Sequence, residues 1–276
     1  MKVTGRLQGH SISIKNNERG VVMYGYMPGL EQANERIVVA KERRVGGHAI
    51  GILLLDVLCP MLPGDVANAS TYNFPVLYKV LDGVGVDQVF RADPTVLERL
   101  IRGGKELERQ GVRAITSDCG YFGNYQKELA TALDVPVFLS SLLQIPLISL
   151  SLKPSQKVGV ICADSRSLSS SLLSACGVDD PSSIVVAGAE ELPESKNLGL
   201  CTGRYNSLKM EQELVGLAVR LINDNPCIGA ILLECSDLPP YAWSIQRAVN
   251  IPVFDFTTMI GWIYAAVVRQ PFAGFV

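Results

Sequence analysis

Short apolar runs alternate with longer segments of helical periodicity along most of the chain. Residues 112–116 form an apolar run of the kind found in strands buried on both faces of a parallel sheet. A helix is expected before this run, because Asp93 and Pro94 favour a helix start and Gly111 favours a helix end. In chain order, the expected elements are a helix at 94–110, a strand at 112–116, a helix at 126–133 and a strand at 135–138.

The same order of elements returns 116 positions later in the chain. Residues 112–142 align with residues 228–258 without a gap, with eight identical pairs in 31 positions, where ordinary residue frequencies give roughly two. A helix capped by Asn206, a strand at 228–233, a helix that follows Pro239 and Pro240, and a strand at 251–254 make up the second set. The identical pairs are Ala114/Ala230, Ile115/Ile231, Cys119/Cys235, Tyr125/Tyr241, Ala132/Ala248, Pro136/Pro252, Val137/Val253 and Phe138/Phe254.

The repeat predicts the fold class. Apolar runs at 49–56 and 157–164 match more loosely and are expected to open each half. We therefore predict an α/β protein of two pseudo-twofold-related lobes, each with a parallel sheet, and a site in the cleft between them. Residues 1–46 fit neither copy and are interpreted as an N-terminal extension.

Two of the seven cysteines hold special positions in this repeat. Cys119 and Cys235 each lie at a strand end and before a helix, where open α/β sheets bind their ligands. We expect the two thiols to face each other across one cleft, with backbone amides nearby to bind an anion and with thiol pKa values lowered by the helix ends. The other cysteines are interpreted as small core residues: Cys59, Cys162, Cys176, Cys201 and Cys227.

Composition narrows the class of protein. The chain has 276 residues with 25 Lys and Arg against 27 Asp and Glu, a net charge of −2, which excludes a basic nucleic-acid coat protein. The longest apolar run, 49–62, is interrupted by Asp56 and Pro60 and is too short to span a bilayer, and the first residues show no secretory signal. We expect a cytoplasmic protein that binds neither nucleic acid nor membrane; a homo-oligomer is compatible with the sequence.

Histidine is scarce, and this limits the thiol chemistry. His10 and His48 both lie outside the repeat, so a hydrolase that pairs Cys with His is disfavoured. No cysteine spacing suggests a metal site, and no cofactor fingerprint is present. Two opposed thiols can instead remove a proton from one face of a carbon next to a carboxylate and return it to the other face.

With Cys119 in Thr-Ser-Asp-Cys-Gly-Tyr-Phe-Gly-Asn-Tyr and Cys235 in Leu-Leu-Glu-Cys-Ser-Asp-Leu-Pro-Pro-Tyr, the chain resembles the aspartate/glutamate racemase superfamily over about residues 47–270. The resemblance implies catalysis by Cys119 and Cys235 without PLP or another cofactor. It also implies exchange of C-terminal segments, so that lobe one comprises 47–140 plus 256–276 and lobe two comprises 141–255.

The residues beside the two cysteines depart from the family pattern. Amino-acid racemases usually have Asn-Thr after the first cysteine, where this chain has Gly120 and Tyr121, and Thr followed by His or Glu after the second, where it has Ser236 and Asp237. Asp118 and Glu234 precede the cysteines; they are either buried partners on the opposite strand face or part of the cleft. In the cleft, their charge would raise the thiol pKa and disfavour an acidic substrate side chain.

Further polar residues are candidates for substrate binding, each with an ordinary loop role as the alternative. Asp56 ends the first strand, Asp65 and Asn68 follow in the next loop, and Asp164 and Ser165 stand at the matching position of the second half. Together with the residues after the cysteines, the predicted substrate-binding set is Asp56, Asp65, Asn68, Gly120, Tyr121, Asp164, Ser165, Ser236 and Asp237.

The sequence therefore predicts a cofactor-independent racemase or epimerase, an isomerase that takes a small-molecule carboxylate such as an amino acid or a derivative. A maleate-isomerase-like or decarboxylase-like member of the superfamily, and a non-catalytic two-lobed small-molecule binding protein, are the alternatives.

Overall fold

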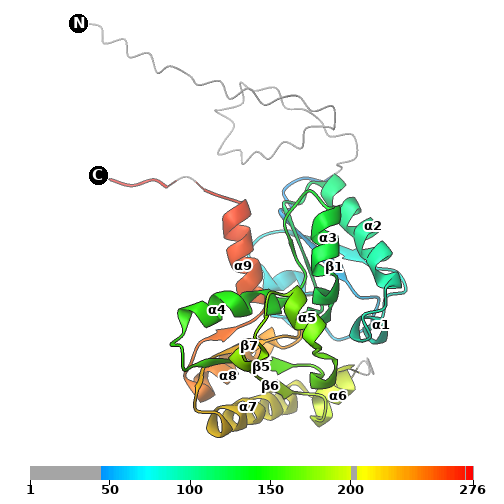
Figure 1. Ribbon diagram of the computed structural model, residues 1–276. Coiled ribbons are helices and arrows are strands. Elements are labelled where there is room, and N and C mark those ends of the chain that lie inside the picture. Colours follow the sequence, from blue (N-terminus) through cyan, green and yellow to red (C-terminus); the bar gives the residue numbers. More distant parts are fainter. Residues whose placement is uncertain (1–44, 200–203, 271, 276) are drawn as a thin grey trace, which may run out of the picture. The chain divides into compact units, whose positions relative to one another are not determined.

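Two four-stranded parallel sheets organise the chain in a computed structural model that describes residues 45–199, 204–270 and 272–275 (Figure 1). The first sheet has the order β2-β1-β3-β4 and the second has the order β6-β5-β7-β8, with every neighbouring pair parallel. The predicted α/β class with two similar sheets is thereby confirmed. The strands are β1 Ile50–Leu54, β2 Val76–Val80, β3 Ala114–Ser117, β4 Val137–Phe138, β5 Lys157–Cys162, β6 Ile184–Gly188, β7 Ile228–Leu233 and β8 Val253–Phe254.

Each predicted long helix has the ends that its sequence indicates. The helix α2 (Thr95–Gln110) begins where the Asp93 carboxylate accepts the Thr95 N–H at 2.9 Å, and it ends at Gly111, whose φ of 86° lies in the left-handed region. The helix α7 (Ser207–Asp224) begins where the Asn206 side chain accepts the Lys209 N–H. The other α-helices are α1 Val86–Phe90, α3 Gln126–Ala132, α4 Ile145–Ser151, α5 Ser170–Ala175, α6 Pro193–Gly199 and α8 Ala242–Val249.

The last helix, α9 (Phe256–Val267), follows the second sheet but packs against the first. Its Met259 and Ile260 are fully buried in one cluster with Ile52 of β1 and Ala114 of β3. Hydrophobic burial of this face fixes the helix on the first sheet. The boundaries at residues 140 and 256 stay a prediction.

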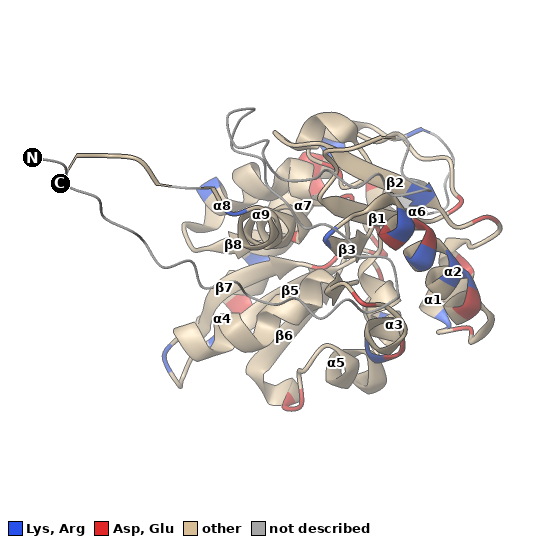
Figure 2. Cartoon of the chain, turned by 90° about the horizontal axis from the view of Figure 1, so that it is seen from above, with Lys and Arg blue, Asp and Glu red and all other residues tan. Residues whose placement is uncertain are grey.

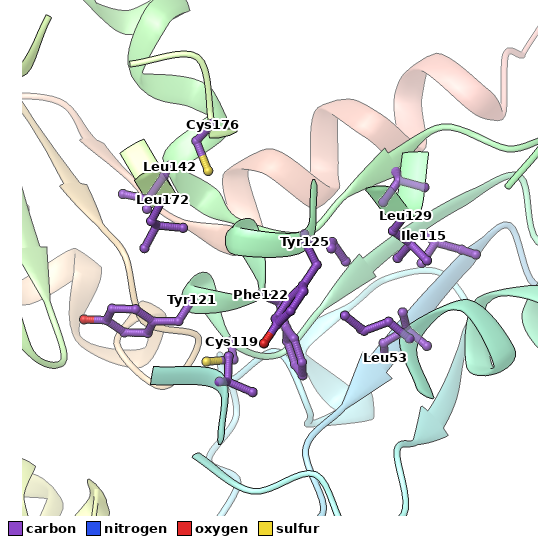
Figure 3. Close-up of a cluster of buried hydrophobic side chains, with 14 of the residues drawn as sticks. Leu53, Ile115, Cys119, Tyr121, Phe122, Tyr125, Leu129, Leu142, Leu172 and Cys176 are labelled. Atoms are coloured by element: carbon purple, nitrogen blue, oxygen red, sulfur yellow. The ribbon is translucent and has the colours of Figure 1, made fainter. Parts of the chain in front are cut away.

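The largest hydrophobic cluster connects the two sheets. It contains Leu53 and Ile115 from the first sheet as well as Val160 and Leu172 from the second half of the chain. Figure 3 shows part of this cluster, in which Cys119 and Tyr121 extend to the same side. Figure 2 shows the strands almost entirely in tan, whereas charged residues gather on helices and loops. The continuous core holds the two strand ends that carry the cysteines in a fixed relation.

The remaining cysteines divide into two groups. Cys162 and Cys176 are buried, as expected of core residues, whereas Cys59 and Cys227 are only half-buried, which corrects the interpretation for these two. Cys201 and most of the predicted extension 1–46 lie outside the described residues. Of the helices that the structure describes, none has the length and apolar character needed to cross a membrane.

Candidate active site

Cys119 and Cys235 line one small cavity of about 70 Å³. Each cysteine stands two residues beyond the end of a strand, Cys119 after β3 and Cys235 after β7. The two lobes thus bring together residues that are far apart in sequence, as the repeat predicts. Five of the predicted substrate-binding residues line the same cavity: Asp65, Gly120, Tyr121, Ser236 and Asp237.

The environment of both thiols favours their protonated form. Removal from water is the largest cause that raises the pKa of Cys119 and of Cys235 well above the ordinary value. Neighbouring carboxylates raise both thiol pKa values further. The largest such effect comes from Glu234 for Cys119 and from Asp237 for Cys235. The backbone N–H groups of Tyr121 and Asp237 donate to the respective sulfur atoms and act in the opposite direction.

The expectation of lowered thiol pKa values is therefore wrong in sign. The helices after the cysteines are short 3-10 turns, at Gly120–Tyr125 and Pro239–Tyr241, and each supplies little of the positive field of a long α-helix. Burial among carboxylates outweighs the single N–H donor at each sulfur. Catalysis by these thiols consequently requires a group that accepts the thiol proton.

Asp118 and Glu234 hold equivalent places in the two lobes. The Asp118 carboxylate accepts the Leu55 N–H with both oxygens, at 3.0 and 3.1 Å, and Glu234 Oε2 accepts the Ala163 N–H at 3.2 Å. Each acid thereby binds the end of the neighbouring strand, and each also lines the cavity. Each acid is therefore both a buried partner of a strand end and part of the cleft, the two roles that the sequence left open. Burial raises the pKa of each carboxyl to about 8.

One difference separates the two acids. Glu234 is fully buried and its Oε1 has no hydrogen-bond partner, whereas both oxygens of Asp118 are occupied. The carboxylate lies directly against the backbone of Gly120, where the Cβ of any other residue would overlap with it. Gly120 is therefore required by the close approach of Glu234 from the other lobe.

Asp65 and Asp237 form a hydrogen-bonded carboxyl pair in the cavity wall. Burial, followed by the neighbouring Asp237, raises the pKa of Asp65 to about 10, and burial raises that of Asp237 as well. Two carboxyl groups in contact cannot both ionise readily, so the pair holds one proton at neutral pH. The Cys235 thiol donates to Asp237 Oδ2 at 3.8 Å, which places a proton acceptor beside this thiol.

Contacts across the cleft fix the residues that follow the cysteines. The Tyr121 hydroxyl donates to the Asp164 carbonyl at 2.6 Å and accepts the Asp164 N–H at 2.9 Å. The Ser236 hydroxyl donates to the Asp118 carbonyl. Each lobe thus holds the cysteine loop of the other, so the cavity is preorganised.

Four predicted binding residues lie outside the cavity wall. Asp56 is exposed and accepts the Gly83 N–H at 2.8 Å, and Asn68 accepts the Ser70 N–H at 2.8 Å as the cap of a 3-10 turn. Asp56 therefore holds the turn after β2 and Asn68 a turn after β1, the ordinary loop role given as the alternative.

The other two, Asp164 and Ser165, stand after β5. Asp164 caps a 3-10 turn and pairs with Arg166 at 2.9 Å, and the Ser165 hydroxyl donates to Glu190. Asp164 also lines a second, more open cavity of about 390 Å³ next to the thiol cavity. Cys235 and Asp237 line both cavities. This places Asp164 beside the approach to the thiols.

No feature of the sequence indicated the apolar wall of the cavity. Phe90 at the end of α1 and Tyr121 form an aromatic pair with ring centroids 4.5 Å apart, and Cys59 and Met61 come from the loop after β1. The charged side chains of the wall are Asp65, Asp118, Glu234 and Asp237; none of the described lining residues is Lys, Arg or His. An acidic cavity with aromatic rings suits a ligand that carries a positive charge. The described residues contain no group of three or more His, Cys, Asp or Glu that could hold a metal ion.

The buried carboxyls make thermal stability depend on pH. Their pKa values are raised in the folded state, so the folded protein binds more protons than the unfolded chain, and the free energy of unfolding falls as pH rises from about 4 through 8. We expect Tm at pH 5.5 to exceed Tm at pH 8.5 by about 5 °C or more, measured by calorimetry at constant ionic strength. Asp65→Asn should reduce the difference, and an equal or higher Tm at pH 8.5 would contradict the assignment.

Solved structures share this fold at low sequence identity. Unliganded arylmalonate decarboxylase is 18% identical with a TM-score of 0.53, over 81% of this chain and 94% of that one. Allantoin racemase from Klebsiella pneumoniae is 19% identical with a TM-score of 0.54, over 81% and 91%. These matches confirm the fold that the resemblance implies.

Curated proteins share more of the sequence. Dimethylsulfoniopropionate lyase 7 of Emiliania huxleyi (strain CCMP1516) is 31% identical over 234 residues, which is 81% of this chain and 68% of that protein. Dimethylsulfoniopropionate lyase of Durusdinium sp. clade D is 28% identical over 239 residues, 84% of this chain and 79% of that protein. No family model matches the chain.

Proposed function

Because the chain belongs to the family of the dimethylsulfoniopropionate lyases, we propose that it is a lyase that splits dimethylsulfoniopropionate into dimethyl sulfide and acrylate. The proton to be removed lies on the carbon next to a carboxylate, the kind of carbon on which the predicted racemase would act. The proposal keeps the predicted proton removal by a thiol. In a racemase the proton then returns to the carbon, whereas in the proposed reaction a leaving group departs. The proposed enzyme class is therefore lyase and not isomerase.

The proposed reaction is an elimination with Cys235 as the base. The Cys235 thiol gives its proton to Asp237, and the thiolate removes a proton from the carbon next to the substrate carboxylate. The electron pair of that C–H bond forms the new C=C bond. The C–S bond breaks and its electron pair stays on sulfur, so neutral dimethyl sulfide leaves together with acrylate. The proton on Asp237 is then released to water, which restores the resting site.

The acidic lining of the thiol cavity is the observation that carries this proposal. All charged side chains among its described lining residues are carboxyls, and their raised pKa values mean that the site resists added negative charge, so a substrate with a second carboxylate, such as aspartate, glutamate or maleate, would be disfavoured. A cationic sulfonium group instead favours the ionised form of these carboxyls and can contact the aromatic rings. Its positive charge also stabilises the electron pair that develops on the neighbouring carbon.

The two thiols have unequal surroundings, which favours one-way proton removal. Cys235 donates to the Asp237 carboxylate, whereas the position equivalent to Asp237 in the first lobe is Tyr121. A racemase uses two thiols in exchangeable roles, while an elimination needs one base. The presence of both thiols in one cavity keeps racemisation of a cationic or neutral amino acid as the second candidate.

Product formation tests the proposal directly. We expect the protein to convert dimethylsulfoniopropionate to equal amounts of dimethyl sulfide, measured by headspace gas chromatography, and acrylate, measured by NMR. Cys227→Ser is the matched control, because this thiol is half-buried and does not line the cavity; it should retain the activity. A folded protein that releases no dimethyl sulfide, but exchanges the α-proton of an amino acid with deuterium from D₂O, would favour the racemase.

A further inference from the structure

We propose that Glu234 is the specificity-determining residue, whose carboxylate charge in the cavity wall attracts the positively charged end of the substrate. The inference rests on the proposed function, because it takes the substrate to be a carboxylate with a cationic group. It assigns one residue of the acidic wall to that group, which neither the repeat nor the resemblance indicates.

The comparison of the two lobes singles out Glu234. Asp118 and Glu234 occupy equivalent positions, 116 residues apart, and bind the N–H of Leu55 and of Ala163 respectively. Aspartate uses both oxygens for that N–H, whereas the longer glutamate side chain uses Oε2 and leaves Oε1 without a partner. The extra methylene therefore supplies a carboxylate oxygen that the fold itself does not use.

An unpartnered carboxylate oxygen is costly where Glu234 lies. The residue is 0% exposed, and a buried polar atom without a hydrogen bond or a counter-charge destabilises the protein. A cation in the cavity would offset this cost. The other carboxyls of the wall are already engaged: Asp118 with Leu55, and Asp65 and Asp237 with each other, with Ala67 and with Cys235.

Aromatic rings complete the expected cation subsite. Phe90 and Tyr121 line the same cavity, with their ring planes tilted by 54°. The Tyr121 hydroxyl lies near Glu234, but its proton is donated to the Asp164 carbonyl and is not available to the carboxylate. A methylated onium group, which has no N–H to donate, suits a carboxylate and ring faces better than it suits a hydrogen-bonding site.

The charge on Glu234 makes cation binding depend on pH. Burial raises the pKa of Glu234 to about 8, so the carboxylate form increases as pH rises from 6 to 9, and affinity for a cation should rise with it. The titratable groups that surround Glu234 in both lobes are Asp118, Cys119, Tyr121, Cys162, Cys176, Cys235 and Asp237. Of these groups, Asp118 also has a pKa of about 8. A pH series alone does not distinguish it from Glu234, so variants of both residues are needed.

Calorimetric binding of two unreactive probes tests the inference. The first is 3-(trimethylammonio)propanoate, and the second is 4,4-dimethylpentanoate, which has the same shape with carbon in place of the cationic nitrogen. We expect wild type at pH 8 to bind the cation about 10- to 100-fold more tightly than the neutral isostere. Glu234→Gln, which keeps an acceptor for the Ala163 N–H, should reduce this preference to about threefold or less. Asp118→Asn, the same change at the equivalent position, should reduce the preference less, because both Asp118 oxygens are engaged by the Leu55 N–H.

The outcomes separate this inference from the proposed function. A Glu234→Gln protein that is folded and keeps the preference, or an Asp118→Asn protein that loses it, overturns the assignment even where dimethyl sulfide is released. Loss of the preference in Glu234→Gln alone supports the assignment even where no dimethyl sulfide is formed, and then the proposed function fails by itself. If Glu234→Gln does not fold, wild type decides: cation affinity that does not rise between pH 6 and 9 overturns the inference.

Discussion

Replacing Cys235 with alanine is expected to lower kcat for dimethyl sulfide release by about 10³-fold, the scale of a positioned general base. Cys235 is the thiol that donates to a carboxylate, with its sulfur 3.8 Å from Asp237 Oδ2. Its pKa is well above the ordinary value, so free thiolate is scarce at neutral pH and the contact to Asp237 provides the route for the proton. Without the sulfur, the Asp237 carboxylate has no relay to the substrate carbon.

The equivalent change at Cys119 is expected to have a smaller effect, about tenfold on kcat, because elimination requires only one base. Cys119 still lines the cavity and shapes it, so KM can rise as well. Both variants should be compared with Cys227→Ser under saturating substrate, with alkylation by iodoacetamide to confirm which thiols remain. A larger loss of kcat in Cys119→Ala than in Cys235→Ala would move the base to the first lobe.

The repeat in the sequence was sufficient to predict that Cys119 and Cys235 lie in one cavity. Strands such as Ile228–Leu233 and helices such as Thr95–Gln110 carry strong local signals, namely a continuous apolar run or a capped periodic pattern. Because both copies place a cysteine two residues after a strand, the meeting of Cys119 and Cys235 follows from topology.

Two edge strands, β2 and β6, and short helices such as α1 were not predicted. Val76–Val80 and Ile184–Gly188 each pair with one neighbour, are only partly buried, and lie outside the aligned repeat. The five-residue helix Val86–Phe90 is too short to show a period, yet it brings Phe90 into the cavity wall. Such elements are set by the packing of distant segments, which a single sequence does not display.

The side-chain environment of the site depends on tertiary contacts for the same reason. Alternation along a strand suggested that Glu234 and Cys235 face opposite ways, but β7 ends at Leu233, so the rule does not extend to them. Asp65 reaches the second lobe through a loop whose Val66 N–H donates to the Ser236 carbonyl at 3.4 Å. Nothing local to Asp65 indicates that its partner is Asp237.

Replacing Asp237 with asparagine is expected to lower kcat by about 10²-fold and to change its pH dependence. In wild type, Asp237 accepts the proton of Cys235 only as a carboxylate. Burial raises the pKa of Asp237, so activity should be present above that pKa and be lost as pH falls through it, in a range higher than for an ordinary aspartate. Asparagine cannot take up a proton, so this acidic limb of the kcat profile should disappear.

Asp65→Asn is the matched control, since it makes the same change in the other half of the carboxyl pair. Asp65 is the partner that carries the shared proton, with its pKa raised to about 10, and it donates to Asp237. An asparagine amide can still donate there, so the acidic limb should persist and kcat should fall by less than about tenfold. The rate of dimethyl sulfide release by both variants should be measured between pH 5 and 9. Saturating substrate ensures that the rates report kcat and not the effect of Glu234 on substrate binding. An acidic limb that survives in Asp237→Asn would show that another group accepts the Cys235 proton, because asparagine at 237 has no proton to gain.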